Sequence, residues 1–225
     1  MTAHFSDDAF STAVRPVPGR AGGAVIYRAR LKRAFDVAVV ILSAPVVLPL
    51  VALLAALVWL DGGRPFYCQT RLGYGGRAFR MWKLRSMVPD AETRLADHLA
   101  RDPEARAEWD RDQKLACDPR ITRLGGVLRK LSLDELPQLW NVLRGEMSLV
   151  GPRPMMPCQR EIYPGRAYWR LRPGLTGLWQ VTARNDSSFA ARAEFDRSYD
   201  AALSLASDLA ILAATIGVVL RATGR

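Results

Sequence analysis

The chain has 225 residues, which is enough for one domain with a sizeable core and a few appendages. Lys and Arg number 32 against 22 Asp and Glu, so the net charge of +10 calls for an anionic partner such as nucleic acid, anionic lipid headgroups or a nucleotide. The three cysteines, Cys68, Cys117 and Cys158, lie far apart, which argues against a disulfide framework or a cysteine zinc site and favours a reducing compartment.

The N-terminal part consists of a polar tail followed by a long apolar segment. Residues 1–27 are rich in Ser, Asp, Pro and Gly and lack apolar periodicity, which predicts a disordered tail. From Val37 to Leu60 the chain is almost wholly apolar and uncharged, a run long enough to cross a bilayer. Basic residues mark the cytoplasmic side of a membrane segment, and here both flanks are basic. The flanking cations are Arg28, Arg30, Lys32 and Arg33 before the run, and Arg64, Arg71, Arg77, Arg80, Lys83 and Arg85 after it.

Two topologies remain open for this segment. Pro45 and Pro49 lie inside the run and can kink a helix. A re-entrant helix over residues 28–61, which enters and leaves through the same leaflet, agrees with both the prolines and the basic flanks. The alternative is a plain spanning helix, because membrane helices tolerate proline.

The next segment predicts a β-hairpin. Phe66 to Met87 has the pattern of two strands around a turn at Gly75-Gly76. Lys83 and Arg85 share one face of the second strand, because side chains alternate with a period of two. This basic face is either solvated beside lipid headgroups or in contact with the phosphates of a substrate.

A charged segment then leads to the central part of the chain. Asp90 to Leu115 favours helix with a break at Asp102-Pro103, which predicts two short helices that cover the core. Arg129 lies shortly before a pair of acidic residues. It is either a surface cation or a partner for a substrate phosphate.

The stretch from Leu131 to Pro154 concentrates the residues that suggest chemistry. The pair Asp134-Glu135 fits a capping box that begins at Ser132. Pro137, however, removes a backbone amide from such a helix and favours a helix that starts at Pro137 itself and stops at Gly145. Acids just ahead of that helix are kept ionised by its positive end, which also favours an incoming anion. Neither interpretation excludes a reaction at one of the carboxylates.

Gly151-Pro152-Arg153-Pro154 holds one arginine between two prolines. The prolines restrict the backbone on both sides of Arg153. The motif is either a rigid surface turn or a prearranged clamp, because fixing an arginine lowers the ordering cost of bidentate binding to phosphate. Such an arginine, close in sequence to paired carboxylates, suggests phosphoryl chemistry with a divalent cation.

The C-terminal part combines aromatic residues with arginines and ends in a helix. Arginines alternate with three aromatic residues, Tyr163, Tyr168 and Trp169, a mixture that suits single-stranded nucleic acid or a membrane interface. The apolar membrane segment in the same chain favours the interface. Arg172-Pro173-Gly174 predicts a second constrained arginine turn, followed by a short strand around Leu178 to Val181. Residues 201–225 predict an amphipathic helix at the interface or packed on the domain, because its apolar run is too short to cross a bilayer and Asp208 interrupts it.

Several motifs occur together in one order along the chain. They are Lys32-Arg33-Ala34-Phe35-Asp36, Lys83-Leu84-Arg85-Ser86-Met87, Ser132-Leu133-Asp134-Glu135-Leu136-Pro137-Gln138-Leu139, Gly151-Pro152-Arg153-Pro154 and Arg172-Pro173-Gly174-Leu175-Thr176-Gly177. With this set the chain resembles the bacterial sugar transferase family, the monotopic polyprenyl-phosphate phosphoglycosyl transferases, over roughly residues 28 to 222. Within the family it most resembles the undecaprenyl-phosphate galactosephosphotransferases that initiate exopolysaccharide synthesis.

The resemblance implies an α/β fold that is mainly helical with a small β-hairpin or sheet. It implies a re-entrant membrane helix broken at Ala44-Pro45, a cytosolic catalytic domain over residues 62–200, and amphipathic helices at the interface. The protein would lie on the inner leaflet of the bacterial cytoplasmic membrane with its catalytic domain facing the cytoplasm.

The resemblance also implies a reaction. A phosphosugar, with galactose favoured over glucose, passes from a UDP-sugar to undecaprenyl phosphate, and UMP is released. Asp134 is the nucleophile and forms a covalent phosphosugar intermediate, while Glu135, together with Asp134, holds Mg²⁺. The residues expected to bind substrate phosphates are Arg153, Arg172, Arg129, Lys83 and Arg184. No nucleic acid is expected as a partner; the alternatives from other classes are a non-catalytic basic membrane protein that binds lipid or nucleic acid, and a membrane scaffold.

Overall fold

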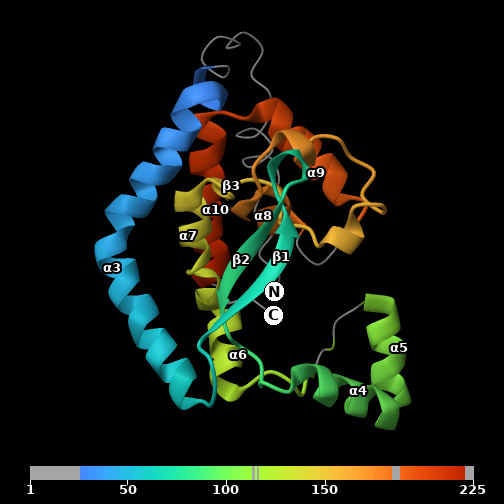
Figure 1. Ribbon diagram of the computed structural model, residues 1–225. Helices are drawn as coiled ribbons and strands as arrows, with labels where there is room; N and C mark the ends of the chain where they lie inside the picture. The colour runs from blue at the N-terminus through green and yellow to red at the C-terminus, as the bar shows by residue number, and fades with distance from the viewer. Residues whose placement is uncertain (1–25, 113–114, 116, 184–187, 221–225) are drawn as a thin grey trace, which may run out of the picture.

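The computed structural model describes residues 26–112, 115, 117–183 and 188–220, and this part of the chain is mainly helical with two small sheets (Figure 1). The predicted fold class is therefore confirmed. The helices are α3 (Lys32–Leu60), α4 (Ala91–Arg101), α5 (Pro103–Asp112), α6 (Arg123–Lys130), α7 (Gln138–Arg144), α8 (Leu178–Thr182), α9 (Arg192–Ala202) and α10 (Leu205–Leu220). The strands are β1 (Phe66–Leu72), β2 (Ala78–Leu84), β3 (Ser148–Val150) and β4 (Gly174–Thr176).

The N-terminal tail predicted over residues 1–27 extends too far. Residues 1–25 lie outside the described part, but Tyr27 begins the short π-helix Tyr27–Leu31 that leads into α3, and its side chain is buried. Burial of this aromatic side chain fixes the start of the helical segment to the core.

The hairpin prediction is confirmed. β1 and β2 pair antiparallel, with Tyr67 opposite Lys83 and Arg71 opposite Phe79. Gly75 and Gly76, with φ of 65° and 77°, supply the left-handed conformations that the tight turn needs.

The second sheet joins β3 to β4 in parallel, with Ser148 opposite Gly174. A Cβ atom on Gly174 would lie 2.1 Å from the backbone nitrogen of Gly151, so glycine is required for this close approach. The strand predicted around Leu178 to Val181 is wrong, because these residues form α8 and the strand is the preceding β4.

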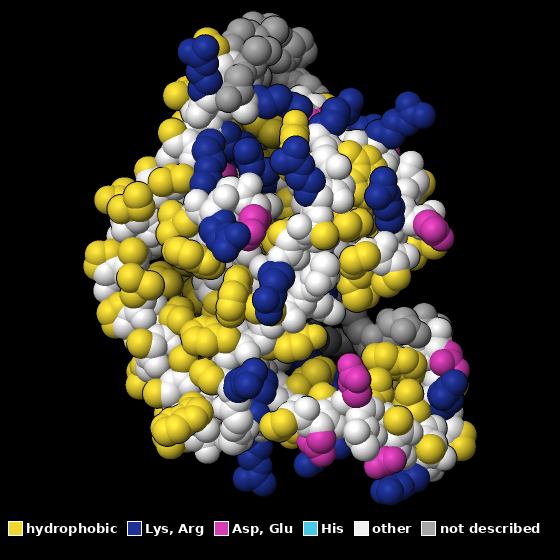
Figure 2. Space-filling model, in the orientation of Figure 1, with side chains coloured by type: hydrophobic (Ala, Val, Ile, Leu, Met, Phe, Trp, Pro, Cys, Tyr) yellow, Lys and Arg dark blue, Asp and Glu magenta, His cyan; other side chains and the backbone are white. Residues whose placement is uncertain are grey.

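α3 is one continuous helix of 29 residues with Pro45 and Pro49 inside it. Figure 1 shows α3 bowed outward from the body near its middle, where a proline can open the helix. The break predicted at Ala44-Pro45 is therefore a bend within one helix and not an interruption between two. α3 is long and apolar enough to cross a membrane, and only 11% of its most apolar window is buried. Figure 2 shows hydrophobic side chains along this edge of the molecule.

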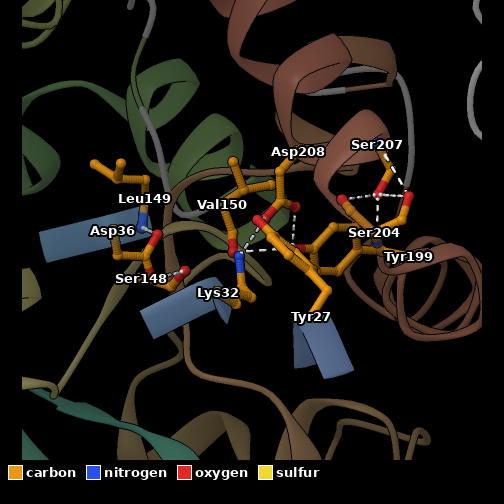
Figure 3. Close-up of polar contacts among 10 residues, drawn as sticks. All are labelled: Tyr27, Lys32, Asp36, Ser148, Leu149, Val150, Tyr199, Ser204, Ser207 and Asp208. Carbon is orange, nitrogen blue, oxygen red and sulfur yellow. Dashed lines mark hydrogen bonds and ion pairs between the residues drawn. The ribbon is translucent and has the colours of Figure 1, made fainter. Parts of the chain in front are cut away.

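A buried carboxylate on α10 anchors the N-terminal end of α3 (Figure 3). Asp208 accepts hydrogen bonds from the hydroxyls of Tyr27 at 2.7 Å and Tyr199 at 2.6 Å, and the Lys32 ammonium lies 2.6 Å from its Oδ2. The Asp36 carboxylate on α3 in turn accepts from the Ser148 hydroxyl at 2.7 Å. Asp208 is 0% exposed, and a buried charge is tolerated only with partners of this kind.

This anchor shows how the helix predicted over residues 201–225 is attached to the domain. Asp208 marks the side of α10 that faces the core, where it lies beside Ile211, and α10 packs on α8, β3 and β4. Leu209 and Ile216 are exposed on α10. Packing on the domain, one of the two predicted arrangements, is confirmed, and a location at the membrane interface stays a prediction. Residues 221–225 lie outside the described part.

The C-terminal end of α3 is attached to the same body. The Arg85 guanidinium donates to the backbone carbonyl of Val58 at 2.7 Å and to that of Gly62. Leu54 and Val58 pack in a cluster with Leu84 of β2 and Leu128 of α6. Both ends of α3 are therefore held by one domain, while its middle stands away from it.

Two further predictions are wrong in part. α4 and α5 form two helices with the predicted break, but they pack on each other and project from the body instead of covering the core (Figure 1). Tyr163 and Tyr168 are 6% and 1% exposed, so they do not lie at an interface. Their hydroxyls donate to Asp196 and to the Leu72 carbonyl, both at 2.6 Å, which satisfies them inside the core.

Candidate active site

The acidic pair lies in a short 3₁₀ turn, Leu133–Glu135, between α6 and α7. Ser132, with φ of 56°, adopts the left-handed conformation that turns the chain into this segment, and its side chain makes no capping hydrogen bond. The capping-box interpretation is therefore wrong. Pro137 is the N-cap of α7 and Gly145, with φ of 78°, ends it, which confirms the predicted start to within one residue and the predicted stop.

Lys83 brings the two carboxylates of this turn together from the neighbouring strand β2. Its ammonium lies 2.7 Å from Oε1 of Glu135 and 3.6 Å from Oδ2 of Asp134. The three side chains are between 9% and 21% exposed, so solvent screens their attraction only in part. Sequence analysis placed Lys83 against a phosphate; the structure places it between the two acids.

Asp134 is the more buried of the two acids, with 7% of the residue exposed. Burial raises the pKa of its carboxyl above the ordinary value, and the neighbouring Glu135 charge raises it further. The positive charges of Lys83 and Arg129 oppose that rise. Lys83 therefore helps to keep a largely buried carboxylate in its ionised form.

A small polar pocket opens beside Glu135 and has a volume of about 20 Å³, close to the space that one water molecule needs. Its lining residues are Arg71, Met81, Lys83, Glu135, Gln138, Arg153, Pro154, Gly174, Leu175 and Gln180. Of the predicted site residues, the structure thus gathers Lys83, Glu135 and Arg153 around one space. A phosphate can enter only if side chains at the rim move apart.

Arg71, Gln138 and Gln180 are pocket residues that sequence analysis did not single out. A signal for Arg71 existed, because the register of the hairpin puts its side chain on the same face as Lys83. Gln138 and Gln180 lie on helices that follow turns, and the pattern of apolar residues does not predict that these turns bring them to the pocket.

Several buried polar atoms in this pocket have no hydrogen-bond partner within the described residues. They are Nε of Arg71, Nε2 of Gln138 and Oε1 of Gln180. Gln138 is only 2% exposed, and a buried donor such as its Nε2 is normally hydrogen-bonded. Unpaired donors beside an arginine and a lysine suit a ligand rich in acceptor oxygens, such as a phosphate.

The other predicted phosphate-binding residues are not part of this lining. Arg129 donates from Nε to the Ser86 hydroxyl at 2.8 Å. Arg172 donates from Nε to the Gly145 carbonyl at 3.0 Å and lies 5.8 Å from the centre of the Tyr74 ring. Arg184 lies outside the described residues, so its predicted role is untested.

An apolar groove of about 430 Å³ lies between α3 and the elements that carry the acidic pair. It is lined by Val40, Ala44, Val47, Leu48, Val51, Phe66, Trp82, Leu136, Pro137, Leu139, Trp140 and Leu143. Trp82 and Leu136 are the chain neighbours of Lys83 and Glu135, so the groove and the polar pocket are built by the same two segments. The outward bow of α3 leaves room for this groove.

The acidic pair has the donor atoms that a magnesium ion prefers. Mg²⁺ in phosphoryl-transfer sites is held by one or two carboxylates together with phosphate oxygens of the substrate. Asp134 and Glu135 already share one cation, the Lys83 ammonium, and their oxygens therefore face a common position. Among the described residues no group of three or more His, Cys, Asp or Glu side chains could hold a metal ion by itself. The residues present fit a metal that is bound jointly with substrate.

Comparison with known proteins shows the family to which the chain belongs. The family model for bacterial sugar transferases matches residues 27–222, and the chain belongs to this family. It is 52% identical over 196 residues to the UDP-galactose-lipid carrier transferase of Erwinia amylovora and 47% identical over 196 residues to the undecaprenyl-phosphate galactose phosphotransferase of Salmonella typhimurium. Each match covers 86% of this chain but only 41% of the relative. The exopolysaccharide production protein ExoY of Rhizobium meliloti is 45% identical over 215 residues, which is 94% of this chain and 91% of that protein.

Proposed function

We propose that the chain is a phosphoglycosyl transferase that moves galactose 1-phosphate from UDP-galactose to undecaprenyl phosphate and releases UMP. The observation that carries this proposal is the shared construction of the polar pocket and the apolar groove. An acceptor with a phosphate head and a long hydrocarbon tail needs a polar site for the head and an apolar site for the tail. Here the polar pocket and the apolar groove are lined by residues that are adjacent in sequence. The names of the Erwinia and Salmonella relatives support the acceptor and the sugar, with glucose as the alternative sugar. The name of the Rhizobium relative supports a role in exopolysaccharide production.

The proposed nucleophile is Asp134. Its carboxylate attacks the sugar-linked phosphorus, an acyl phosphate forms, and UMP leaves; the lipid phosphate then displaces the carboxylate. A carboxylate needs no general base near neutral pH, and covalent catalysis divides one difficult step into two easier ones. Lys83 supports this role because its charge opposes the effect of burial on the pKa of Asp134. Glu135 lines the pocket, and Arg153 is the predicted phosphate ligand that lines it with Glu135.

Glu135, with Asp134, would hold a magnesium ion in this proposal. The ion, when bound, neutralises charge on the substrate phosphates and so lowers the repulsion between two anions that must meet. The side chains of the chain itself do the rest: Lys83 orients the carboxylates, and Arg153 binds phosphate oxygens.

We further propose that α3 is re-entrant and that the catalytic domain lies on the cytoplasmic face of the membrane. A straight helix of 29 residues would be about 44 Å long, more than the roughly 30 Å of a hydrocarbon core. If α3 crossed the bilayer, its ends would lie on opposite sides. Both ends are instead bound to one domain, by Asp208 at one end and by Arg85 at the other. The basic flanks support the cytoplasmic side.

The experiment that tests the proposed function measures UMP release from a panel of UDP-sugars, with undecaprenyl phosphate and Mg²⁺, for protein in nanodiscs. Wild type should release UMP with UDP-galactose and transfer the labelled sugar phosphate to lipid, whereas Asp134→Asn should do neither. Release of UDP in place of UMP would indicate ordinary glycosyl transfer and contradict the proposal. The absence of turnover with any sugar in a folded sample would favour a binding or scaffold protein.

A further inference from the structure

The basic side of the polar pocket holds two arginines that form no ion pair with an acid among the described residues. Arg71 lies on β1 and Arg153 in the loop after β3, and both line the pocket. Neither forms an ion pair with a carboxylate of the described residues. Arg71 donates from Nη1 to the Pro154 carbonyl at 3.3 Å, which ties its guanidinium to the loop that carries Arg153.

Hydrogen bonds hold the Arg71 guanidinium in place, but one of its N–H donors has no partner among the described residues. Its Nη2 donates to Oε1 of Gln69 at 2.5 Å, while its buried Nε has no partner among the described residues. Burial and the positive charge of Arg153 lower the pKa of Arg71, so the two cations repel each other. A dianionic phosphate between them would remove this repulsion and supply acceptor oxygens to both. The pair is therefore suited to bind an anion.

Two successive displacements at one phosphorus require a binding site for a phosphate group opposite the Asp134 carboxylate. In the first step, a bond forms between the Asp134 carboxylate and the sugar-linked phosphorus, and the bond to the phosphate of UMP breaks, with the electron pair leaving on UMP. In the second step, an oxygen of the lipid phosphate bonds to the same phosphorus, and the carboxylate leaves with its electron pair. An in-line displacement puts the entering and leaving groups on opposite sides of the phosphorus. The departing nucleotide phosphate and the incoming lipid phosphate therefore both lie opposite the carboxylate, at different times.

We propose that Arg71, together with Arg153, forms one phosphate subsite that serves both half-reactions, first for the phosphate of the departing nucleotide and then for that of the incoming lipid. This inference rests on the proposed function. Charge that develops on the leaving phosphate is stabilised by the paired guanidiniums, and the same cations then attract and orient the lipid phosphate. Arg71 is a substrate-binding residue in this scheme.

The test separates the two half-reactions in nanodiscs with Mg²⁺ and UDP-galactose labelled in the sugar. The first is measured as single-turnover UMP release without acceptor, and the second as discharge of the isolated phosphosugar enzyme by undecaprenyl phosphate. Arg71→Gln should slow both by a similar factor, on the order of 100-fold. Arg71→Lys keeps the charge but loses the bidentate guanidinium, so its rates in both half-reactions should lie between those of wild type and Arg71→Gln. The matched control is Arg77→Gln, an exposed arginine on the same hairpin, which should behave as wild type.

A competition measurement on wild type tests the inference without a variant, in case Arg71→Gln does not fold. UMP and undecaprenyl phosphate are offered together to the phosphosugar enzyme. One shared subsite predicts that UMP raises the apparent KM for the lipid and leaves the maximal rate unchanged.

Inhibition that lowers the maximal rate, or a slowing of only one half-reaction in folded Arg71→Gln, would overturn the inference. Unchanged rates in both half-reactions would overturn it as well, while the proposed function would stand if wild type still released UMP. Wild type that releases no UMP refutes the proposed function, and the inference with it.

Discussion

Replacement of Lys83 by methionine removes the cation that the acidic pair shares while keeping the length and apolar stem of the side chain. The Lys83 ammonium lies 3.6 Å from Asp134, and at an effective dielectric constant of about 20 the attraction between unit charges at that distance is about 5 kcal/mol. Desolvation of both groups offsets part of this. Removing one partner of a buried pair costs about 3 to 5 kcal/mol, and because these side chains are 21% and 9% exposed we expect a value near the lower end, about 3 kcal/mol.

The assay for this prediction combines stability and turnover. Denaturant unfolding at neutral pH should give the loss of about 3 kcal/mol for Lys83→Met. UMP release should fall on the order of 100-fold, because the Asp134 carboxylate is less often ionised and loses the cation that orients it. Lys130→Met, an exposed lysine on α6, is the matched control and should change neither quantity. The double variant Lys83→Met with Glu135→Gln removes one negative charge as well, so it should recover much of the stability but none of the activity. A Lys83→Met protein as stable and as active as the control would refute the role assigned to Lys83.

Three further predictions concern the carboxylates of the site and of the core. Asp134→Asn should abolish labelling of the protein by the sugar phosphate, whereas Glu135→Gln should label slowly; mass spectrometry of the labelled peptide checks this, and label on Glu135 would reverse the two roles. Burial raises the pKa of Asp196 from 3.8 to about 6, so its contribution to stability is present below pH 3.8 and is lost as the pH rises through about 6. The unfolding free energy of Asp196→Asn minus that of wild type should therefore increase by up to about 3 kcal/mol between about pH 4 and pH 7, and a constant difference would contradict the pKa. Lys32→Met leaves Asp208 buried without its cation and should cost about 3 to 5 kcal/mol, much of which Asp208→Asn should restore in the double variant; equal unfolding midpoints for wild type and Lys32→Met would show that the anchor of α3 contributes little.

The elements that were predicted well are those with strong local signals. The hairpin depends on a two-glycine turn between strands of alternating pattern, and the start and stop of α7 depend on Pro137 and Gly145. The long apolar run likewise predicts the long helix α3. In each case the conformation follows from residues that are close in sequence, so no knowledge of distant contacts is needed.

What the sequence does not reveal are contacts between distant segments. The sequence shows Asp208 only as an interruption of an apolar run, because nothing near it in sequence indicates that Tyr27 and Lys32, at the other end of the chain, bury and pair with it. Tyr163 and Tyr168 were placed at an interface, since their partners Asp196 and Leu72 are likewise remote. An amphipathic residue looks the same in sequence whether water, lipid or the core satisfies its polar atom.

The mainly helical fold, the long apolar helix and the acidic pair within its family motif can all be predicted from residues that are close together in the chain. The position of Lys83 between the two acids, the pocket that Arg71 shares with Arg153, and the contact of Arg172 with Gly145 follow instead from how distant segments pack. So does the attachment of both ends of α3 to one domain. The physical reason is that turn and helix signals act over a few residues, whereas the pairing of buried charges is settled by which segments the packing of the core brings together.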